Sequence, residues 1–136
     1  MNLEELQKSE IGFLSHIGGE LIDFSEGYAQ LAFEIKDIHK QHLGVVHGGA
    51  IATLADHAGW YAAVSEISIG QTCVTIELKI NYLKPAFQEL LRAEARVINR
   101  TKKTVFVVIE LFDKDRIVAY ATATYSVITE KRSSSC

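Results

Sequence analysis

The sequence predicts an α+β domain in which one long helix and one antiparallel sheet bury each other. Residues 48–66 repeat apolar side chains at three- and four-residue spacing, which is typical of a helix. The segments on either side alternate apolar and polar residues, which is the period of a half-buried strand. Residues 113–116 have the character of a tight hairpin turn, so the strands are expected to run antiparallel.

A short helix and two strands are expected before the long helix. The amphipathic helix, a glycine break and the two strands fall, in order, at residues 2–10, 18–19, 20–24 and 28–36. In the second strand Ala29, Leu31, Phe33 and Ile35 alternate with polar residues, so one face is expected to be buried. A polar loop then leads to the helix.

The long helix is nearly apolar all round and rich in alanine. Ile51, Leu54, Ala55, Ala58 and Ala62 recur along it. A flat sheet would cover only one side of such a helix, so we expect the sheet to curl around it. The small side chains would let the strands approach the helix closely.

Four strands are expected after the helix, at residues 73–83, 89–99, 104–113 and 116–128. Pro85 ends the first of them. The third is apolar on both faces at its start, which fits a central or interfacial strand. Apolar surface at a sheet edge or on the helix would favour a dimer.

The composition limits the class of function. The 136 residues suit one domain, expected over residues 1–130, with residues 1–11 as an appended N-terminal helix and 131–136 as a flexible tail. A net charge of −3 argues against a non-specific nucleic-acid binder. No apolar run approaches the ~20 residues of a membrane helix, and the acidic start is unlike a secretory signal. We therefore expect a cytoplasmic protein without a nucleic-acid or membrane partner.

A bound metal is not expected. Cys73 and Cys136 form no CxxC pair, so neither a disulfide framework nor a thiolate metal site is indicated. Four histidines lie close together in the sequence, but their spacing fits no HExxH or HxH pattern. These are His39, His42, His47 and His57. Glycine-rich nucleotide fingerprints are also absent from the sequence.

The start of the long helix is a candidate site for an anion or a polarised carbonyl. His47, Gly48 and Gly49 stand where the first backbone N–H groups lack helical partners and the helix dipole adds positive charge. Glycine lets a ligand come close to the backbone. The alternative is that the two glycines only permit a tight turn into the helix.

Asp56 lies two turns into this apolar helix. Ionised carboxylates are rarely buried without a partner, so Asp56 is a candidate base or nucleophile. The alternative is an aspartate that reaches solvent or a loop.

A basic segment lies between two predicted strands and contains Arg100, Lys102 and Lys103. It is either a solvated turn or a clamp for phosphate groups.

Two segments together resemble a known family. QHLGVVHGGAIATLAD (residues 41–56) and TIELKINYLKPA (75–86), joined by the alanine-rich helix, resemble the hotdog-fold acyl-CoA thioesterases of the phenylacetate-degradation type. The G-x-x-H-G-G-x-x-x-x-L-x-D core is the specific part, and the element order matches over residues 12–130. The resemblance implies a hotdog fold, a homodimer commonly paired into a homotetramer, and active sites at the subunit interface.

The resemblance also implies roles for individual residues. Asp56 takes the place of the catalytic carboxylate, and the Gly48 N–H polarises the thioester carbonyl. Gln41 faces the nucleophilic water or the thioester, although an ordinary solvated loop would also explain it. His47 lies near the carbonyl or the leaving thiol, and Thr75 orients the carboxylate. Gln41 and Gly48 would face Asp56 and Thr75 of the other subunit.

The expected function is hydrolysis of an acyl- or aryl-CoA thioester to the free acid and coenzyme A, with no cofactor beyond the coenzyme A of the substrate. An acyl-carrier protein is an alternative carrier. A non-catalytic acyl-CoA binding protein and a hotdog hydratase or dehydratase are alternative functions. Trp60 and Tyr61 either floor the acyl pocket or are core packing. The substrate-binding residues expected are Gly49, Trp60, Asn81, Arg100, Lys102 and Lys103.

One expectation conflicts with another. Strict alternation places Thr75 on the same strand face as Glu77 and Lys79, which is expected to be solvated. The resemblance instead places Thr75 beside the carboxylate. An interface at that face would reconcile the two.

Overall fold

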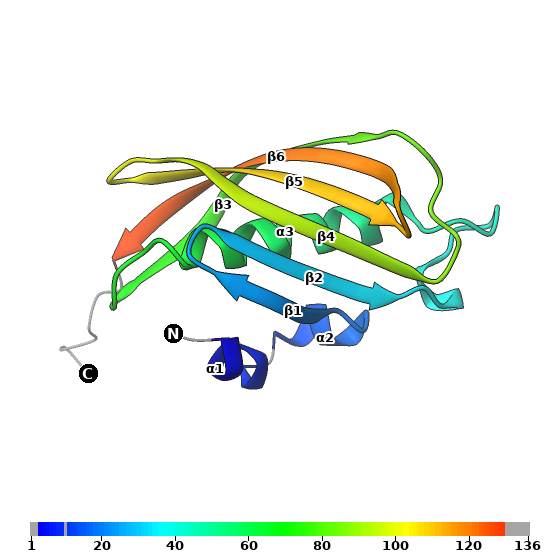
Figure 1. Cartoon of the computed structure of the whole chain (residues 1–136), viewed down its shortest axis with the longest axis horizontal. Coiled ribbons are helices and arrows are strands. Elements are labelled where there is room, and N and C mark those ends of the chain that lie inside the picture. Colours follow the sequence, from blue (N-terminus) through cyan, green and yellow to red (C-terminus); the bar gives the residue numbers. More distant parts are fainter. Residues whose placement is uncertain (1–2, 10, 130–136) are drawn as a thin grey trace.

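The computed structural model describes residues 3–9 and 11–129, and its centre is one long helix, α3 (Gly48–Val64). Six antiparallel strands form a single sheet in the order β1-β2-β4-β5-β6-β3. Figure 1 shows this sheet curving over α3, with two short N-terminal helices beside β1. The predicted α+β fold, a long central helix wrapped by a curved antiparallel sheet, is confirmed.

All six predicted strands are present, with ends that differ by at most two residues. They are β1 (Glu20–Ser25), β2 (Tyr28–Glu34), β3 (Gln71–Tyr82), β4 (Leu90–Arg100), β5 (Thr104–Asp113) and β6 (Arg116–Thr129). β5 lies between β4 and β6, the central position that its apolar faces indicated. β1 and β3 are the two edges of the sheet.

Three short helical segments complete the fold: α1 (Leu3–Lys8), α2 (Gly12–His16) and the 3₁₀ turn η1 (Asp37–His39). α1 was predicted, whereas α2 and η1 were not, because five and three residues are too few to show a helical period. None of the helices in residues 3–9 and 11–129 is long and apolar enough to cross a membrane. The tail predicted at 131–136, with Cys136, lies outside the described residues.

Small side chains fill the layer between α3 and the sheet. Ala55, Ala58 and Ala62 of the helix are completely buried. α3 contacts strands β1 to β6, and the alanines of the sheet that are buried in the same core are Ala29, Ala93, Ala95, Ala119, Ala121 and Ala123. Because these side chains are short, the strands pass close to the helix and the sheet wraps around it.

An irregularity in β3 decides which of its side chains face the helix. A β-bulge separates Thr75, which pairs with Tyr125 of β6, from Glu77, which pairs with Thr124. The extra residue, Ile76, puts Thr75 and Glu77 on opposite faces of the sheet. The strict alternation that placed Thr75 on the solvated face is therefore wrong at this point. Thr75 faces α3, where its hydroxyl bonds Asp56.

His39 ties the loop before α3 to the rest of the molecule. Its imidazole is buried and stacks on Phe33 of β2 at 4.0 Å between ring centres. Nδ1 accepts from the Lys36 N–H at 2.9 Å, and Nε2 donates to the Ile17 carbonyl at 2.6 Å. The His39 carbonyl accepts from the His47 N–H at 2.7 Å. The residue before the helix is thus held by a histidine whose ring nitrogens are both occupied.

We expect His39→Ala to lower the free energy of unfolding by about 2–4 kcal/mol, because it leaves a cavity beside Phe33 and removes two buried hydrogen bonds. Urea unfolding followed by circular dichroism measures this loss. His42→Ala, at an exposed position in the same loop, is the matched control and should change stability by less than about 0.5 kcal/mol. Equal stabilities for the two variants would contradict this role of His39.

Candidate active site

The first turn of α3 has one backbone donor to spare. The Gly49 N–H donates to Nδ1 of His47 at 2.8 Å, so His47 is the N-cap of the helix. The next two N–H groups, of Ala50 and Ile51, both donate to the His47 carbonyl. Within the described part of the chain the Gly48 N–H has no acceptor. It is therefore the donor of this turn that a ligand can use.

The capping bond also fixes the tautomer of His47. Because Nδ1 accepts a hydrogen bond, the proton of the neutral ring is on Nε2. The side chain is exposed, so Nε2–H is available as a donor beside the helix start. His47 thus presents a second donor near the Gly48 N–H.

The end of β3 covers the other side of Gly48. The Tyr82 hydroxyl donates to the Gly48 carbonyl at 2.8 Å. A Cβ atom at position 48 would lie 3.2 Å from Cζ of Tyr82, so the close approach of this ring favours glycine. Residues 82–86 with Val46, Gly48 and Ile51 line a hollow of about 310 Å³ here.

Asp56 is half-buried at the middle of α3, and its carboxylate accepts hydrogen bonds from side chains of the sheet. Oδ1 accepts from the Thr75 hydroxyl at 2.8 Å and from the Tyr125 hydroxyl at 3.1 Å. Oδ2 has no hydrogen-bond donor among the described residues. The carboxylate therefore has one oxygen occupied by protein donors and one that is free for another molecule.

The hollow beside Asp56 is small and largely apolar. It measures about 230 Å³, and Ile11, His57, Trp60 and Thr75 line it with Asp56. The Trp60 indole donates to the Cys73 carbonyl at 2.8 Å, which fixes its ring along this wall. Sites for drug-sized ligands usually measure ~300–1,000 Å³, so the hollow fits one acyl or aryl group and not a whole acyl-CoA.

The two candidate groups are apart in a single chain. Gly48 and Asp56 differ by eight positions, which is roughly 12 Å along the helix at 1.5 Å per residue. A reacting carbonyl must lie about 3 Å from its donor, and a general base must lie within hydrogen-bond reach of the water that attacks the carbonyl. The hollows at Gly48 and at Asp56 share no lining residue. In one chain the two candidate groups therefore lie in separate hollows, which we call the two candidate half-sites.

Comparison with known proteins identifies the family. The thioesterase superfamily matches residues 43–120, which include Gly48 and Asp56. A predicted esterase of Saccharolobus solfataricus is 36% identical over 132 residues, covering 96% of this chain and 87% of the relative. The chain belongs to the thioesterase superfamily.

Two further relatives agree with this assignment. A medium/long-chain acyl-CoA thioesterase of Escherichia coli is 28% identical, with 82% of each chain covered. The solved structure of a thioesterase from Haemophilus influenzae matches with a TM-score of 0.91 at 25% identity, covering 98% of this chain and 95% of that one. The chain is a thioester hydrolase with the hotdog fold, as the resemblance implied. This favours hydrolysis over a binding protein or a hydratase.

Other predicted residues of this thioesterase lie away from Asp56. The Gln41 side chain closes its own loop by accepting from the Leu43 N–H. Asn81 pairs with the exposed Tyr120 on the outer face of the sheet, so in one chain it does not meet α3.

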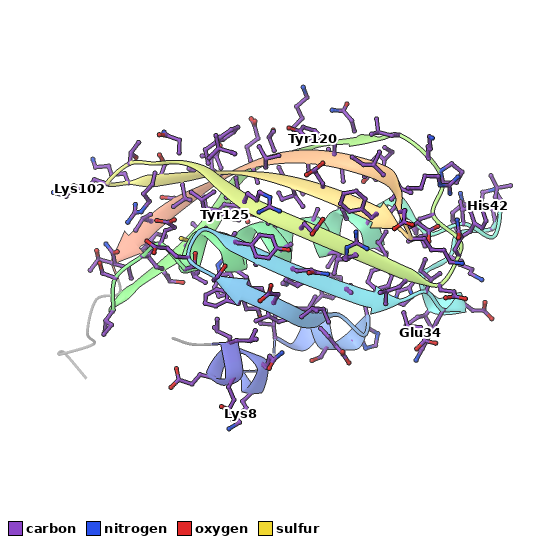
Figure 2. All side chains as sticks on the ribbon, in the orientation of Figure 1. Lys8, Glu34, His42, Lys102, Tyr120 and Tyr125 are labelled. Carbon is purple, nitrogen blue, oxygen red and sulfur yellow. The ribbon has the colours of Figure 1, made fainter. Side chains whose placement is uncertain are left out.

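The predicted basic segment lies at one end of the thioesterase. Arg100 is bound to the Glu66 carbonyl at 3.3 Å near the end of α3. Lys102 and Lys103 are exposed in the β4–β5 turn. Figure 2 shows Lys102 and His42 at opposite ends of the molecule. In a single chain the basic segment and the loop of Gln41 and His42 are therefore far apart.

Tyr125 and Ile11 are parts of the site that the sequence did not reveal. Tyr125 is completely buried, and burial together with the negative charge of Asp56 raises the pKa of its phenol far above the usual 10. The only sequence signal was an aromatic residue that ends the alanine series on one face of β6. Ile11 was expected in the N-terminal helix of residues 1–11, but it is the N-cap of α2 and lines the hollow beside Asp56.

Two larger hollows of the thioesterase, of about 590 and 520 Å³, flank α2 and β1. Neither is lined by Gly48 or Asp56, and the smaller one is lined by Tyr61. We place the candidate site at Gly48 and Asp56, where the free backbone donor and the held carboxylate lie. The described residues contain no group of three or more histidine, cysteine or acidic side chains arranged to hold a metal ion.

We expect His47→Ala to lower the free energy of unfolding by about 1 kcal/mol, because the Gly49 N–H loses its cap. His47→Asn should restore this stability, since asparagine is a good N-cap residue. Chemical unfolding of the three proteins measures both effects. A stable alanine variant, or an asparagine variant as unstable as alanine, would show that the cap does not support the helix.

Proposed function

We propose that this thioesterase hydrolyses acyl- or aryl-CoA thioesters and that Asp56 is its general base or nucleophile. The observation that carries the proposal is the Asp56 carboxylate, with Oδ1 held by two hydroxyl donors and Oδ2 open beside a small apolar hollow. The Escherichia coli relative, named for medium- and long-chain acyl-CoA, supports a coenzyme A thioester as substrate. An acyl-carrier protein remains the alternative carrier.

The complete site is proposed to form between two subunits. Gly48 of one subunit would polarise the thioester carbonyl, and Asp56 of the other would act on the same group. The roughly 12 Å between them in one helix supports this arrangement. β3 is an edge strand with exposed apolar side chains, Val74 and Ile76, so a second copy has a surface to cover. We propose a homodimer, alone or paired into a homotetramer.

The chemistry follows from these groups. In the general-base route, Oδ2 of Asp56 takes a proton from water while the water oxygen bonds to the carbonyl carbon. The Gly48 N–H, with His47 Nε2–H nearby, stabilises the negative charge on the carbonyl oxygen. The C–S bond then breaks and its electron pair leaves on sulfur. The thiolate of coenzyme A takes the proton that Asp56 received from water. In the nucleophilic route Oδ2 attacks the carbonyl carbon instead, and water hydrolyses the resulting anhydride.

The remaining predicted residues belong to substrate binding in this proposal. Gln41 Nε2 is a donor for the water or the thioester, and Gly49 lets the substrate approach the helix start. Asn81 would reach substrate only as part of the assembly. The basic side chains Arg100, Lys102 and Lys103 would bind the phosphates at the nucleotide end of coenzyme A.

We expect Asp56→Asn to lower kcat for acyl-CoA by at least about 10²–10⁴-fold, the range that a general base contributes. The asparagine oxygen still accepts from Thr75 and Tyr125, so the fold and the oligomer should remain. Release of the coenzyme A thiol measures the rate, and size-exclusion chromatography checks the assembly. Asp115→Asn, an exposed carboxylate in the β5–β6 turn, is the control and should retain full activity. Unchanged turnover by Asp56→Asn would end the proposal.

The apolar hollow at Asp56 is proposed to hold the acyl group, with Ile11 as one wall and Trp60 as another. We expect Ile11→Trp to raise KM or lower kcat/KM by about tenfold for the best substrate of the native enzyme and less for shorter chains, because the larger side chain fills the hollow. The panel to measure is short-, medium- and long-chain acyl-CoA, phenylacetyl-CoA and hydroxybenzoyl-CoA. Ile38→Trp, at an exposed residue outside the hollow, is the control. An identical substrate profile in both variants would place the acyl group elsewhere.

A further inference from the structure

Tyr125 makes both of its hydrogen bonds to one residue. Its hydroxyl lies 3.1 Å from Oδ1 of Asp56 and 2.9 Å from the main-chain carbonyl oxygen of the same residue. The ring is completely buried between β6 and α3. Figure 2 shows Tyr125 near the middle of the molecule, away from both ends of the sheet. Its single proton is therefore shared between two acceptors of Asp56.

The register of the sheet brings Tyr125 and Thr75 to the same oxygen. The two residues lie directly opposite each other on β6 and β3, so their side chains are neighbours on the inner face. Both hydroxyls donate to Oδ1. The bulge at Ile76 produces this pairing, because a regular strand would have carried Glu77 on the same face as Thr75.

The helix leaves room for the phenol at Gly59, which is buried one turn after Asp56. A Cβ atom at position 59 would lie 2.2 Å from the Tyr125 oxygen and 3.0 Å from its Cζ atom. No side chain fits there without displacing the ring. Glycine costs helix stability at an interior position, so its presence here is explained by the approach of Tyr125.

The phenol stays protonated under ordinary conditions. Burial, and then the nearby negative charge of Asp56, raise the pKa of Tyr125 well above that of a free tyrosine. At neutral pH the group is therefore a hydrogen-bond donor and never a competing anion.

We propose that Tyr125 is a positioning residue for catalysis, which occupies Oδ1 of Asp56 together with Thr75 and so presents Oδ2 to the water or the thioester. This inference rests on the proposed role of Asp56. Two donors from rigid strands restrict rotation of the carboxylate, and the third donor that Oδ2 still lacks would come from the reacting water. Tyr125 itself lines neither hollow, so in this proposal it acts only through Asp56.

The test is Tyr125→Phe, which removes the hydroxyl and keeps the ring. We expect kcat to fall by about 10- to 100-fold, the effect of losing a hydrogen bond to a charged group. KM should change by less than about threefold, since no substrate contact is lost. Tyr28→Phe is the matched control, because the Tyr28 hydroxyl also contacts a carboxylate, Glu94 at 3.2 Å, but outside both half-sites. The control should keep the native kcat.

A stability measurement separates positioning from a purely structural effect. A weakened fold lowers kcat only through the fraction of enzyme that is folded, which circular dichroism measures under the assay conditions. We expect Tyr125→Phe to lose kcat per folded enzyme while KM stays near the native value. A native kcat per folded enzyme would overturn the proposal.

Gly59→Ala provides a second route if Tyr125→Phe does not fold. The added methyl displaces the hydroxyl, so kcat should fall while KM stays near the native value, as for Tyr125→Phe. In the double variant the two losses in kcat should not add, because there is no hydroxyl left to displace. Losses that multiply, or a folded Gly59→Ala enzyme with native kcat, would contradict the proposal.

The outcome for Asp56→Asn distinguishes this inference from the function on which it rests. An inactive Asp56→Asn enzyme with a fully active Tyr125→Phe enzyme would overturn the role of Tyr125 alone. An active Asp56→Asn enzyme would overturn the proposed function, and the positioning role with it.

Discussion

The structure depends on the need to bury most of a helix that is apolar apart from one half-buried face, which carries Thr53, Asp56 and His57. A flat sheet would leave part of α3 in water, and at about 25 cal/mol per Å² exposed apolar area is costly. The sheet therefore curves around the helix, as Figure 1 shows. Curvature of this kind needs short side chains on the inner face, and the buried alanines of α3, β4 and β6 supply them.

The burial of α3 by the sheet also determines how the Asp56 carboxylate is stabilised on this helix. A carboxylate that leaves water needs compensating donors, and a charge-assisted hydrogen bond stabilises by about 1.5–3 kcal/mol. The alanine series of β6 ends at Tyr125, and the bulge in β3 turns Thr75 inward beside it. The donors thus come from the wrapping sheet, so the element that buries the helix also holds the carboxylate. Oδ2 of Asp56, which receives no hydrogen bond from the sheet, is the oxygen proposed to act on the water or the thioester.

Periodicity was sufficient to predict the fold, and a short motif led to the roles proposed for Gly48 and Asp56. Gly48 and Asp56 stand on one helix whose limits follow from its own residues. The bulge at Ile76 was not predictable, because Val74, Ile76, Leu78 and Ile80 continue a perfect alternation in the sequence while the strand does not. Tyr125 lies 69 positions from Asp56, and only the pairing of β3 with β6 brings it there. The role of His39 depends likewise on the Ile17 carbonyl, a backbone atom in an unpredicted segment.

The helix carries its two functional groups in different ways. The Gly48 N–H is a backbone donor that exists because a helix begins there, and capping by His47 leaves it unpaired while satisfying its neighbours. Asp56 is a side chain that needs the sheet to hold it. Since α3 is a rigid rod, the spacing between the groups is set by the rise of the helix and cannot shrink. In the proposed dimer the thioester takes the two groups from different copies of α3. The spacing along the helix supports this dimer as much as the exposed edge of β3 does.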